Sequence, residues 1–494
     1  MSRVFISILR GIHLLFLSVI LNFAKIISET HLMQTSDRAK FNSKIGMVLA
    51  TAGSAIGLGN IWRFPVMTGD NGGAAFIFMY ILCVLILGIP LMTAEFIVGR
   101  HAHANTAQAF RKLTNGWLWR KIGKFGIITA WFILCYYIVV SGWTLDYLVD
   151  ALFNRFNALA ATGNADAYAH HFQNFVSDPY LPVIYMILFM LMSHFVIVRG
   201  VKKGIEKSSK ILMPILFIIM VLLMISSLLT AGASEGLRFL FYPDFSKITV
   251  STVLGAMGQA FYSLSVAMGC ICTYASYFSK DVKLVNTAFK VAGIDTMIAI
   301  MSGVIIFPAV FSVGITPDAG PSLVFIALPN VFQQAFGNIP AMGYIVSVLF
   351  YGLLVLATLT SVISLQEVVT AYLSEEFALS RAKAAGIVTV VCVFVGSLCA
   401  LSMGPLKDFT IGGRNLFHFF DFFSGQIMLP IGGFLIALFV GWFMRRRVIW
   451  EQLTNQSSIP GRGIRTIIVL LKFFVPFLIL LIFLSGIGFF QLFS

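Results

Sequence analysis

Charged side chains are scarce in this chain of 494 residues, where Asp, Glu, Lys and Arg together make up 11% and hydrophobic residues 59%. With a mean hydropathy of +0.92, the chain is too apolar for a water-soluble globular protein of its length. The alternation of apolar and polar positions that builds a membrane β-barrel is also missing. The sequence therefore predicts an all-α integral membrane protein.

Clusters that would bind a metal or supply a nucleophile are missing as well. The six cysteines lie within apolar stretches, and we expect them to pack as small buried thiols. The few histidines lie near the ends of these stretches or in connections, away from the acidic residues inside them. These absences argue against a membrane enzyme, which is the competing functional class.

A single basic run or face, as nucleic-acid binding would require, is not present despite the formal net charge of +14. The basic residues instead gather in alternate connections, for example around Arg38, Arg120 and Arg445. This pattern follows the positive-inside rule and predicts that these connections are cytoplasmic. We expect a multi-pass protein of the cell (inner) membrane with a cytoplasmic N-terminus, whose partners are the lipid bilayer and a small molecule.

Apolar runs long enough to cross the bilayer predict about 11 transmembrane helices. Their approximate limits are 45–68, 73–99, 124–150, 181–199, 208–232, 249–278, 284–313, 341–373, 383–402, 418–443 and 464–492. An odd number of spans with a cytoplasmic start places the C-terminus outside. The outer connection 314–340 carries GPSLVFIALPNVF, which is too short to span and is expected to form a lid helix over the bundle.

Residues 1–32 contain an apolar stretch with basic flanks that resembles a signal or anchor but lacks a clear cleavage site. Met33 opens a polar segment, 33–44, that suits a cytoplasmic leader. We expect the functional start to be Met33, with the extension either outside the functional protein or a dispensable anchor.

The stretch GSAIGLGNIWRFP, residues 53–65, places helix breakers inside the first span. Irregular backbone is tolerated in a bilayer only where it faces protein or a cavity. A broken helix exposes carbonyls that can bind a cation and amides that favour an anionic group. The alternative is that the glycines only allow close helix packing.

A second interruption, QAFYSLSVAMG at 259–269, opens the sixth span. Paired interruptions in matching positions indicate inverted repeats with a binding site at the bilayer midplane. The repeats would cover 45–232 and 249–443, with 464–492 as an additional span.

Several motifs in order resemble the neurotransmitter:sodium symporter family, in its bacterial 11-span branch of sodium-dependent amino-acid transporters. They are GSAIGLGNIWRFP, NGGAAFIFMYILCVLILGIPLMTAEF, TYASYFSKD, GPSLVFIALPNVF, LATLTSVISL and DFFSG, and the resemblance covers residues 40–494. It implies a 5+5 inverted-repeat bundle with broken helices 1 and 6. It also implies a symporter, not an enzyme, that imports an amino acid with Na⁺ by alternating access.

The resemblance implies two sodium sites. The first would use the carbonyl of Ala55, the side chains of Asn60, Ser263 and Asp295, and the substrate carboxylate. The second would use the carbonyls of Gly53, Ile56 and Ala357 with the hydroxyls of Thr360 and Ser361. Oxygen ligands suit a hard cation such as Na⁺. Taken alone, the two hydroxyls of the second set are equally typical of side chains bonded to their own helix.

The resemblance also implies a substrate pocket. Its residues would be Ala55, Gly57, Gly59, Ile133, Tyr137, Tyr262, Ser263, Ser265, Met268, Ser364 and Leu365. Gly57 leaves room for a carboxylate where monoamine carriers have an aspartate, and the apolar wall suits a neutral, hydrophobic or aromatic amino acid. Ordinary core packing is the alternative for each apolar position. A betaine-like osmolyte transporter and a sodium-linked sensor without turnover remain alternative functions.

Asp295 bears on chloride, because a carboxylate inside a span is costly and is functional by default. Many family members have an amide at this position and bind chloride nearby. Tyr80, Gln259 and Ser263 of that chloride pattern are present, but Ala299 replaces the expected serine. We expect the Asp295 carboxylate to replace chloride, so no chloride should be required.

Gates follow from the same resemblance. Arg63 would meet Asp421 across the outer vestibule beside Gln259, and Arg38 would meet Glu375 near Tyr277 on the inner side. Solvated loop charges are the alternative for Arg38 and Glu375. Phe41 stands where the family has a tryptophan in the leader. Glu95 corresponds to a glutamate that hydrogen-bonds the broken helices and has a structural role.

Overall fold

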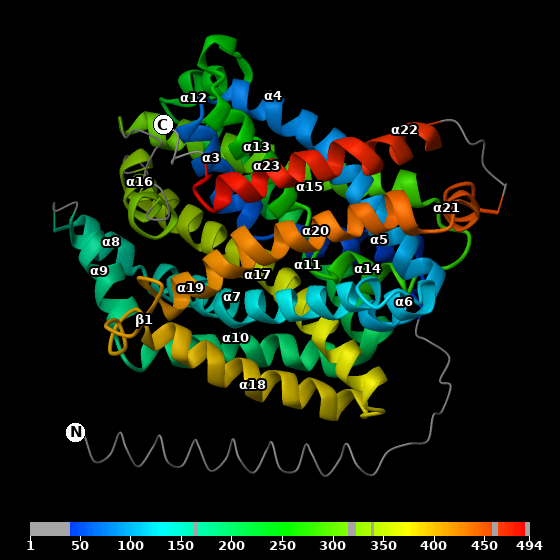
Figure 1. Cartoon of the computed structure of the whole chain (residues 1–494). Helices are drawn as coiled ribbons and strands as arrows, with labels where there is room; N and C mark the ends of the chain where they lie inside the picture. Colours follow the sequence, from blue (N-terminus) through cyan, green and yellow to red (C-terminus); the bar gives the residue numbers. More distant parts are fainter. Residues whose placement is uncertain (1–39, 163–165, 315–322, 337–339, 457–462, 490–494) are drawn as a thin grey trace.

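The structure, a computed structural model, describes residues 40–162, 166–314, 323–336, 340–456 and 463–489. The expectations for the extension 1–32 and for Arg38 lie outside the described residues. Within them the protein is a bundle of helices with a single short hairpin, formed by β1 (Thr410–Ile411) and β2 (Arg414–Asn415) (Figure 1). The all-helical membrane fold predicted from the composition is confirmed.

Nine of the described helices are long and apolar enough to cross a membrane. They are built from α4 (Ala74–Cys83), η2 (Val84–Gly88) and α5 (Ile89–Ala102); η3 (Trp119–Lys121) and α7 (Ile122–Leu152); α10 (Leu181–Val198); η4 (Val201–Glu206) and α11 (Lys207–Leu228); α15 (Leu284–Ser312); α17 (Pro340–Glu376); α18 (Arg381–Leu401); α19 (Leu416–Phe422), η7 (Phe423–Met428), α20 (Leu429–Leu438) and η8 (Phe439–Phe443); and α22 (Ile464–Val469), η9 (Leu470–Phe474) and α23 (Val475–Gly486). Together with the two broken helices described next, they are consistent with the expected 11 spans.

The first broken helix consists of α2 (Lys44–Ala55), followed by η1 (Gly59–Arg63) and α3 (Phe64–Asp70), with a bend of 56° between its halves. The break is much shorter than the stretch 53–65, because α2 continues through Gly53 to Ala55, Ile56 is extended, and η1 begins at Gly59. A glycine is required at the bend: a Cβ on Gly57 would lie 2.6 Å from the Ser361 hydroxyl oxygen and 2.7 Å from that of Tyr137.

The second broken helix consists of α13 (Val250–Ser263) and α14 (Cys270–Ala275). The expected interruption at 259–269 begins later in the structure, since the helix continues to Ser263. In the segment 264–269, Ser265 and Ala267 have left-handed φ angles of 50° and 70°. Such angles cost a non-glycine residue about 1–3 kcal/mol and require surrounding contacts to hold them.

Shorter elements occupy the connections. They are α6 (Thr106–Leu113), α8 (Arg155–Ala160), α9 (Asp166–Ser177), α12 (Ala233–Phe241), η5 (Phe245–Lys247), η6 (Leu323–Ala327), α16 (Leu328–Ala335) and α21 (Arg446–Leu453). The described part of the expected lid, η6 with α16, is helical. Its Phe325 ring packs against Trp62 at 5.9 Å, and the Tyr147 hydroxyl donates to the Phe325 carbonyl at 2.8 Å. These contacts hold η6 against the first broken helix.

Helix α5 lies against the second half of the broken helix 6 at Gly99. A Cβ on Gly99 would lie 2.1 Å from the Cys272 carbonyl oxygen and 2.8 Å from the Ala275 Cβ. The first neighbour is backbone and cannot rotate away. This close approach brings the middle of α5, and with it Glu95, next to the unwound segment.

The substitution Gly99→Ala should therefore destabilise the protein by about 1–3 kcal/mol, because the two helices must separate to admit one methyl group. Thermal unfolding of the purified protein in detergent measures this effect as a lower midpoint. Gly386→Ala is the control, since nothing lies within 4 Å of a Cβ at that helical glycine. Equal midpoints for both variants would contradict the prediction.

Candidate sodium and substrate sites

The two breaks meet in the middle of the bundle and are joined by side chains. The Ser265 hydroxyl donates to the Ser54 carbonyl at 2.8 Å, and the Gln259 amide donates to the Gly59 carbonyl at 2.7 Å. Backbone groups that the helices leave free at one break are thus satisfied by residues of the other. The breaks form a single polar centre.

The residues proposed for the first sodium site come together around Asp295. The Asn60 amide donates to the Asp295 carboxylate at 2.7 Å, the Ser263 hydroxyl at 2.9 Å and the Tyr80 hydroxyl at 3.2 Å. Asp295 and Asn60 are fully buried, and Ser263 is 2% exposed. All three hydrogen-bond donors are neutral, so the carboxylate is a buried anion suited to a bound cation. Ala55 lines the adjoining cavity.

The residues proposed for the second sodium site also converge. The Ser361 hydroxyl donates to the Ile56 carbonyl at 3.0 Å, and the Thr360 hydroxyl reaches the same oxygen at 3.4 Å. Both hydroxyls also reach the Ala357 carbonyl of their own helix, Thr360 at 2.9 Å and Ser361 at 3.4 Å. The local bonding considered as an alternative is therefore present, together with a contact between α17 and the first break. A Cβ on Gly53 would lie 3.3 Å from the Met213 Sδ and 3.4 Å from the Thr360 Cβ, so Gly53 packs between α11 and α17.

A cavity lies between the breaks and α7. It is lined by Ser54, Ala55, Gly57, Gly59, Ile133, Tyr137, Tyr262, Ser263, Ser265, Met268, Cys270, Ser361 and Leu365. The Leu58 amide donates to the Tyr137 hydroxyl at 3.2 Å, which aims that hydroxyl at the first break. The lining combines polar groups, such as the hydroxyls of Tyr137 and Ser265, with the apolar side chains of Ile133, Met268 and Leu365.

Sequence reasoning and the structure differ in four members of this lining, one of which is Ser361, a residue assigned only to the second sodium site. Ser364 is not part of it, because its hydroxyl pairs with Tyr274 at 2.9 Å. Ser54 and Cys270 line the cavity although neither was assigned to the pocket. Cys270 was grouped with the buried thiols, and its place directly after the unwound segment was the signal that could have found it.

Glu95 caps the second break from α5. Its carboxylate accepts the backbone N–H of Ala267 at 2.5 Å and that of Cys272 at 3.3 Å, and the side chain is 1% exposed. The contact to Ala267 holds a residue with a left-handed backbone. Glu95 therefore fixes the conformation of the segment that forms one side of the cavity.

On the outer side, Arg63 lies over Tyr262. The guanidinium carbon is 4.6 Å from the ring centre, a cation–π arrangement. Asp421 is exposed and interacts electrostatically with the hydroxyls of Tyr136 and Tyr262. The described residues contain no ion pair between Arg63 and Asp421 within 4.0 Å. Tyr262 also lines the cavity, and Gln259 is fully buried and donates to the Gly59 carbonyl.

On the inner side, Tyr277 bonds to an acid that was not assigned to a gate. The Tyr277 hydroxyl donates to Glu367 at 2.6 Å, and Arg381 forms an ion pair with the same carboxylate. Glu375 accepts the backbone N–H of Asn105 at 2.9 Å, at the start of α6, and its expected pairing with Arg38 lies outside the described residues. Sequence reasoning missed Glu367 because no spacing links it to Tyr277 and Arg381.

Two more contacts close the inner end. Phe41 packs edge-on against Tyr274 and Tyr277, with ring centres 6.2 and 6.0 Å apart. Lys44, at the start of α2, forms an ion pair with Asp281 at 2.7 Å. The hydrogen-bonded Lys44 ammonium lowers the pKa of Asp281 to about 2. Both contacts join the start of the first broken helix to α14 or to the chain that follows it.

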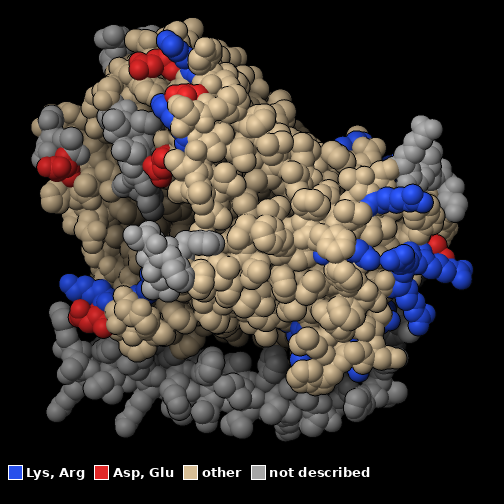
Figure 2. Space-filling view, turned by 45° about the horizontal axis from the view of Figure 1, so that its top comes forward, with Lys and Arg blue, Asp and Glu red and all other residues tan. Residues whose placement is uncertain are grey.

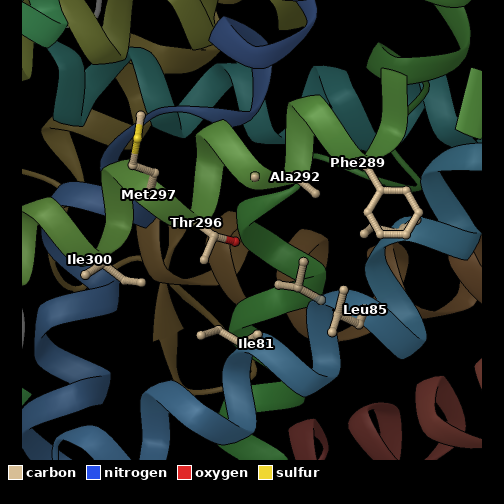
Figure 3. A pocket seen from close by; sticks show the side chains of 10 residues that line it. Ile81, Leu85, Phe289, Ala292, Thr296, Met297 and Ile300 are labelled. Carbon is tan, nitrogen blue, oxygen red and sulfur yellow. The ribbon is translucent and has the colours of Figure 1, made fainter. Parts of the chain in front are cut away.

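A larger cavity of about 390 Å³ opens between η2 with its neighbours and α15 (Figure 3). Ile81, Leu85, Phe289 and Met297 point into it, and Thr296 supplies its hydroxyl. Its walls are apolar membrane spans, and no charged residue lines it. Asp295 is not among its lining residues, and an uncharged, apolar cavity does not suit an ion or a zwitterion.

The comparisons with known proteins agree with this geometry. The profile of the Sodium:neurotransmitter symporter family matches residues 38–161 and 160–492. The uncharacterized sodium-dependent transporter YhdH of Bacillus subtilis is 35% identical over 457 residues, covering 92% of this chain and 99% of its own. An uncharacterized sodium-dependent transporter of Haemophilus influenzae is 32% identical, covering 91% and 98%.

Among solved structures, the crystal structure of MhsT in complex with L-phenylalanine superposes with a TM-score of 0.81. It is 41% identical in sequence, and the match covers 91% of this chain and 100% of MhsT. Two broken helices, a buried carboxylate between them and these matches over nearly the whole chain lead to one conclusion: this protein belongs to the Sodium:neurotransmitter symporter family.

Proposed function

We propose that this protein imports a neutral amino acid with a hydrophobic or aromatic side chain, together with Na⁺. The observation that carries the proposal is the cavity, whose lining combines Ser263, a member of the buried Asp295 cluster, with the apolar side chains of Ile133, Met268 and Leu365. A zwitterion fits such a place, because its carboxylate can meet the first break and a sodium ion while its side chain is buried. The complex of MhsT with L-phenylalanine supports this class of substrate.

Two sodium ions would bind, one at each cluster of oxygen atoms. Asn60, Ser263, Asp295 and the Ala55 carbonyl would hold the first, next to the substrate carboxylate. The carbonyls of Gly53, Ile56 and Ala357 and the hydroxyls of Thr360 and Ser361 would hold the second, between the first broken helix and α17. Each ion would replace hydrogen bonds that now join the same atoms, so sodium binding and the packing of the breaks are coupled.

Chloride would not be needed. Asp295 carries the negative charge that a chloride ion would otherwise provide, and Ala299, which is fully buried, offers no hydroxyl to hold one. The carboxylate shares this position with Ser263 and Tyr80, the groups a chloride would contact.

Transport would proceed by alternating access, in which the repeats 45–232 and 249–443 move against each other around the central site. Tyr262 with Arg63 would close the outer side. Phe41 with Tyr277 would close the inner side. The protein would lie in the inner membrane with its basic connections facing the cytoplasm. This orientation places the C-terminus outside.

Reconstituted protein should accumulate labelled phenylalanine in liposomes when an inward Na⁺ gradient is imposed in chloride-free gluconate buffer. Without the gradient, uptake should fall to the level of empty liposomes. Binding without accumulation would identify a sensor, and competition by a betaine but not by amino acids would identify an osmolyte carrier. A loss of uptake in gluconate that chloride restores would contradict the role of Asp295.

Asp295→Asn should raise the Na⁺ concentration for half-maximal uptake at least about tenfold, since the first sodium site loses its charge, at a cost of about 1.4 kcal/mol or more. The double variant with Ala299→Ser should regain activity only when chloride is present. Met297→Leu is the control, because Met297 lines the larger, apolar cavity. An Asp295→Asn variant with unchanged sodium dependence would rule out this role.

Glu95→Gln should lower both thermal stability and uptake. The amide can accept from one of the two backbone N–H groups and places a donor against the other, which leaves a buried group unsatisfied at about 1–3 kcal/mol. Melting in detergent and uptake in liposomes measure the two effects. Glu235→Gln removes an exposed carboxylate of α12 and should change neither; identical behaviour of the two variants would show that Glu95 is dispensable.

A further inference from the structure

Two segments that are far apart in the sequence, 117–124 and 442–450, lie side by side at one end of the bundle. The ring centres of Trp119 and Phe443 are 4.2 Å apart, and Trp119 also packs on Phe439 at 5.9 Å. The first segment begins the span Trp119–Leu152, and the second follows the span Leu416–Phe443. We call their combined exposed face the basic–aromatic surface.

This surface is strongly positive. Its exposed basic residues are Arg120, Lys121, Lys124, Arg445, Arg446 and Arg447, and neither segment contains Asp or Glu. Among the described residues, Arg447 is the one member of this set with an ion pair, to Glu451 at 2.7 Å. Figure 2 shows basic side chains gathered on the right, at the end of the molecule that holds α21.

Large aromatic side chains lie between the charges. Trp117 is 72% exposed, Trp442 52%, Phe443 58% and Trp450 43%. The Lys121 ammonium lies 3.7 Å from the centre of the Trp117 ring. Exposed tryptophans beside the ends of two spans are typical of the boundary between hydrocarbon and headgroups. At that depth the neighbours of the six charges are lipid headgroups.

We propose that the basic–aromatic surface binds the headgroups of anionic phospholipids. The arginines supply donors with the geometry of a phosphodiester, and the tryptophans hold the surface at the depth where phosphates lie. A soluble acidic protein could pair with the basic side chains but would not account for the exposed tryptophans. The combination of both residue types from two distant segments favours lipid.

The surface is connected to the transport machinery through α21. Arg100, near the end of α5, is 4% exposed and donates to the side chains of Gln452 at 2.6 Å and Asn455 at 2.9 Å. Gln452 lies in α21, and α5 carries Glu95. A headgroup that holds α21 against the membrane therefore also supports the helix that caps the second break, so anionic lipid should increase the rate of uptake.

The test uses the intact protein in phosphatidylcholine liposomes to which about 10 mol% of a dibrominated lipid is added. Four of the seven tryptophans, Trp117, Trp119, Trp442 and Trp450, lie in this surface and report its lipid contacts by fluorescence quenching. Brominated phosphatidylglycerol should quench more strongly than brominated phosphatidylcholine. The triple variant Lys121→Gln, Arg445→Gln, Arg446→Gln should reduce this preference roughly tenfold or more and lower the stimulation of uptake by phosphatidylglycerol.

The matched control removes three exposed lysines elsewhere, Lys202→Gln, Lys203→Gln and Lys207→Gln, and should keep the preference. Equal quenching by both lipids in the unmodified protein would overturn the proposal. So would an equal loss in the two triple variants, which would indicate a general charge effect. Abolition of the preference by millimolar inorganic phosphate would assign the charges to a soluble anion instead.

Discussion

A transmembrane helix that is interrupted leaves backbone N–H and C=O groups in a place without water, and the rest of this structure depends on how those groups are satisfied. At the first break, the Leu58 amide bonds to Tyr137, the Gly57 amide to the Asn60 side chain, and the Gly59 carbonyl to Gln259. At the second, the amides of Ala267 and Cys272 bond to Glu95. The interruptions persist because every one of these partners comes from a neighbouring span or from the break itself.

These partners are largely the same residues as those proposed to bind ions and substrate. Asn60 holds the first break and also contacts Asp295, and Ser361 both meets the Ile56 carbonyl and lines the cavity. A ligand at these residues would therefore exchange with internal hydrogen bonds. Such an exchange suits a carrier that must release what it binds.

The parts of the site that could be predicted from the sequence are those with a local chemical signature. Glycines within an apolar run predicted the first break, and hydroxyls together with a glycine predicted the second. Asp295 was identified because it is a carboxylate within a span. The boundaries were less accurate, because residues 259–263 contain hydroxyl and amide groups that a helix accommodates as well as a loop does. The segment that follows Ser263 is held by Glu95, which lies on another span.

Pairings across the bundle were the least predictable. Nothing in the sequence links Tyr277 to Glu367 and Arg381, since the three lie in the turn after α14, in α17 and in α18, and meet only when these segments pack. The membership of Cys270 in the cavity also depends on the direction in which the chain leaves the unwound segment. Uniformly apolar spans have almost no periodicity to show which face is buried, so these contacts require the folded arrangement.

The inner end of the bundle is held by two ion pairs of very different character. Lys44 and Asp281 have side chains that are 72% and 58% exposed, whereas Glu367, paired with Arg381, is fully buried. Dissolved salt screens the first pair strongly and the second hardly at all. Raising the ionic strength therefore weakens the contact between the start of α2 and the loop after α14, while the pair between α17 and α18 stays nearly constant. The same end of the bundle thus combines a salt-sensitive contact with a salt-resistant one.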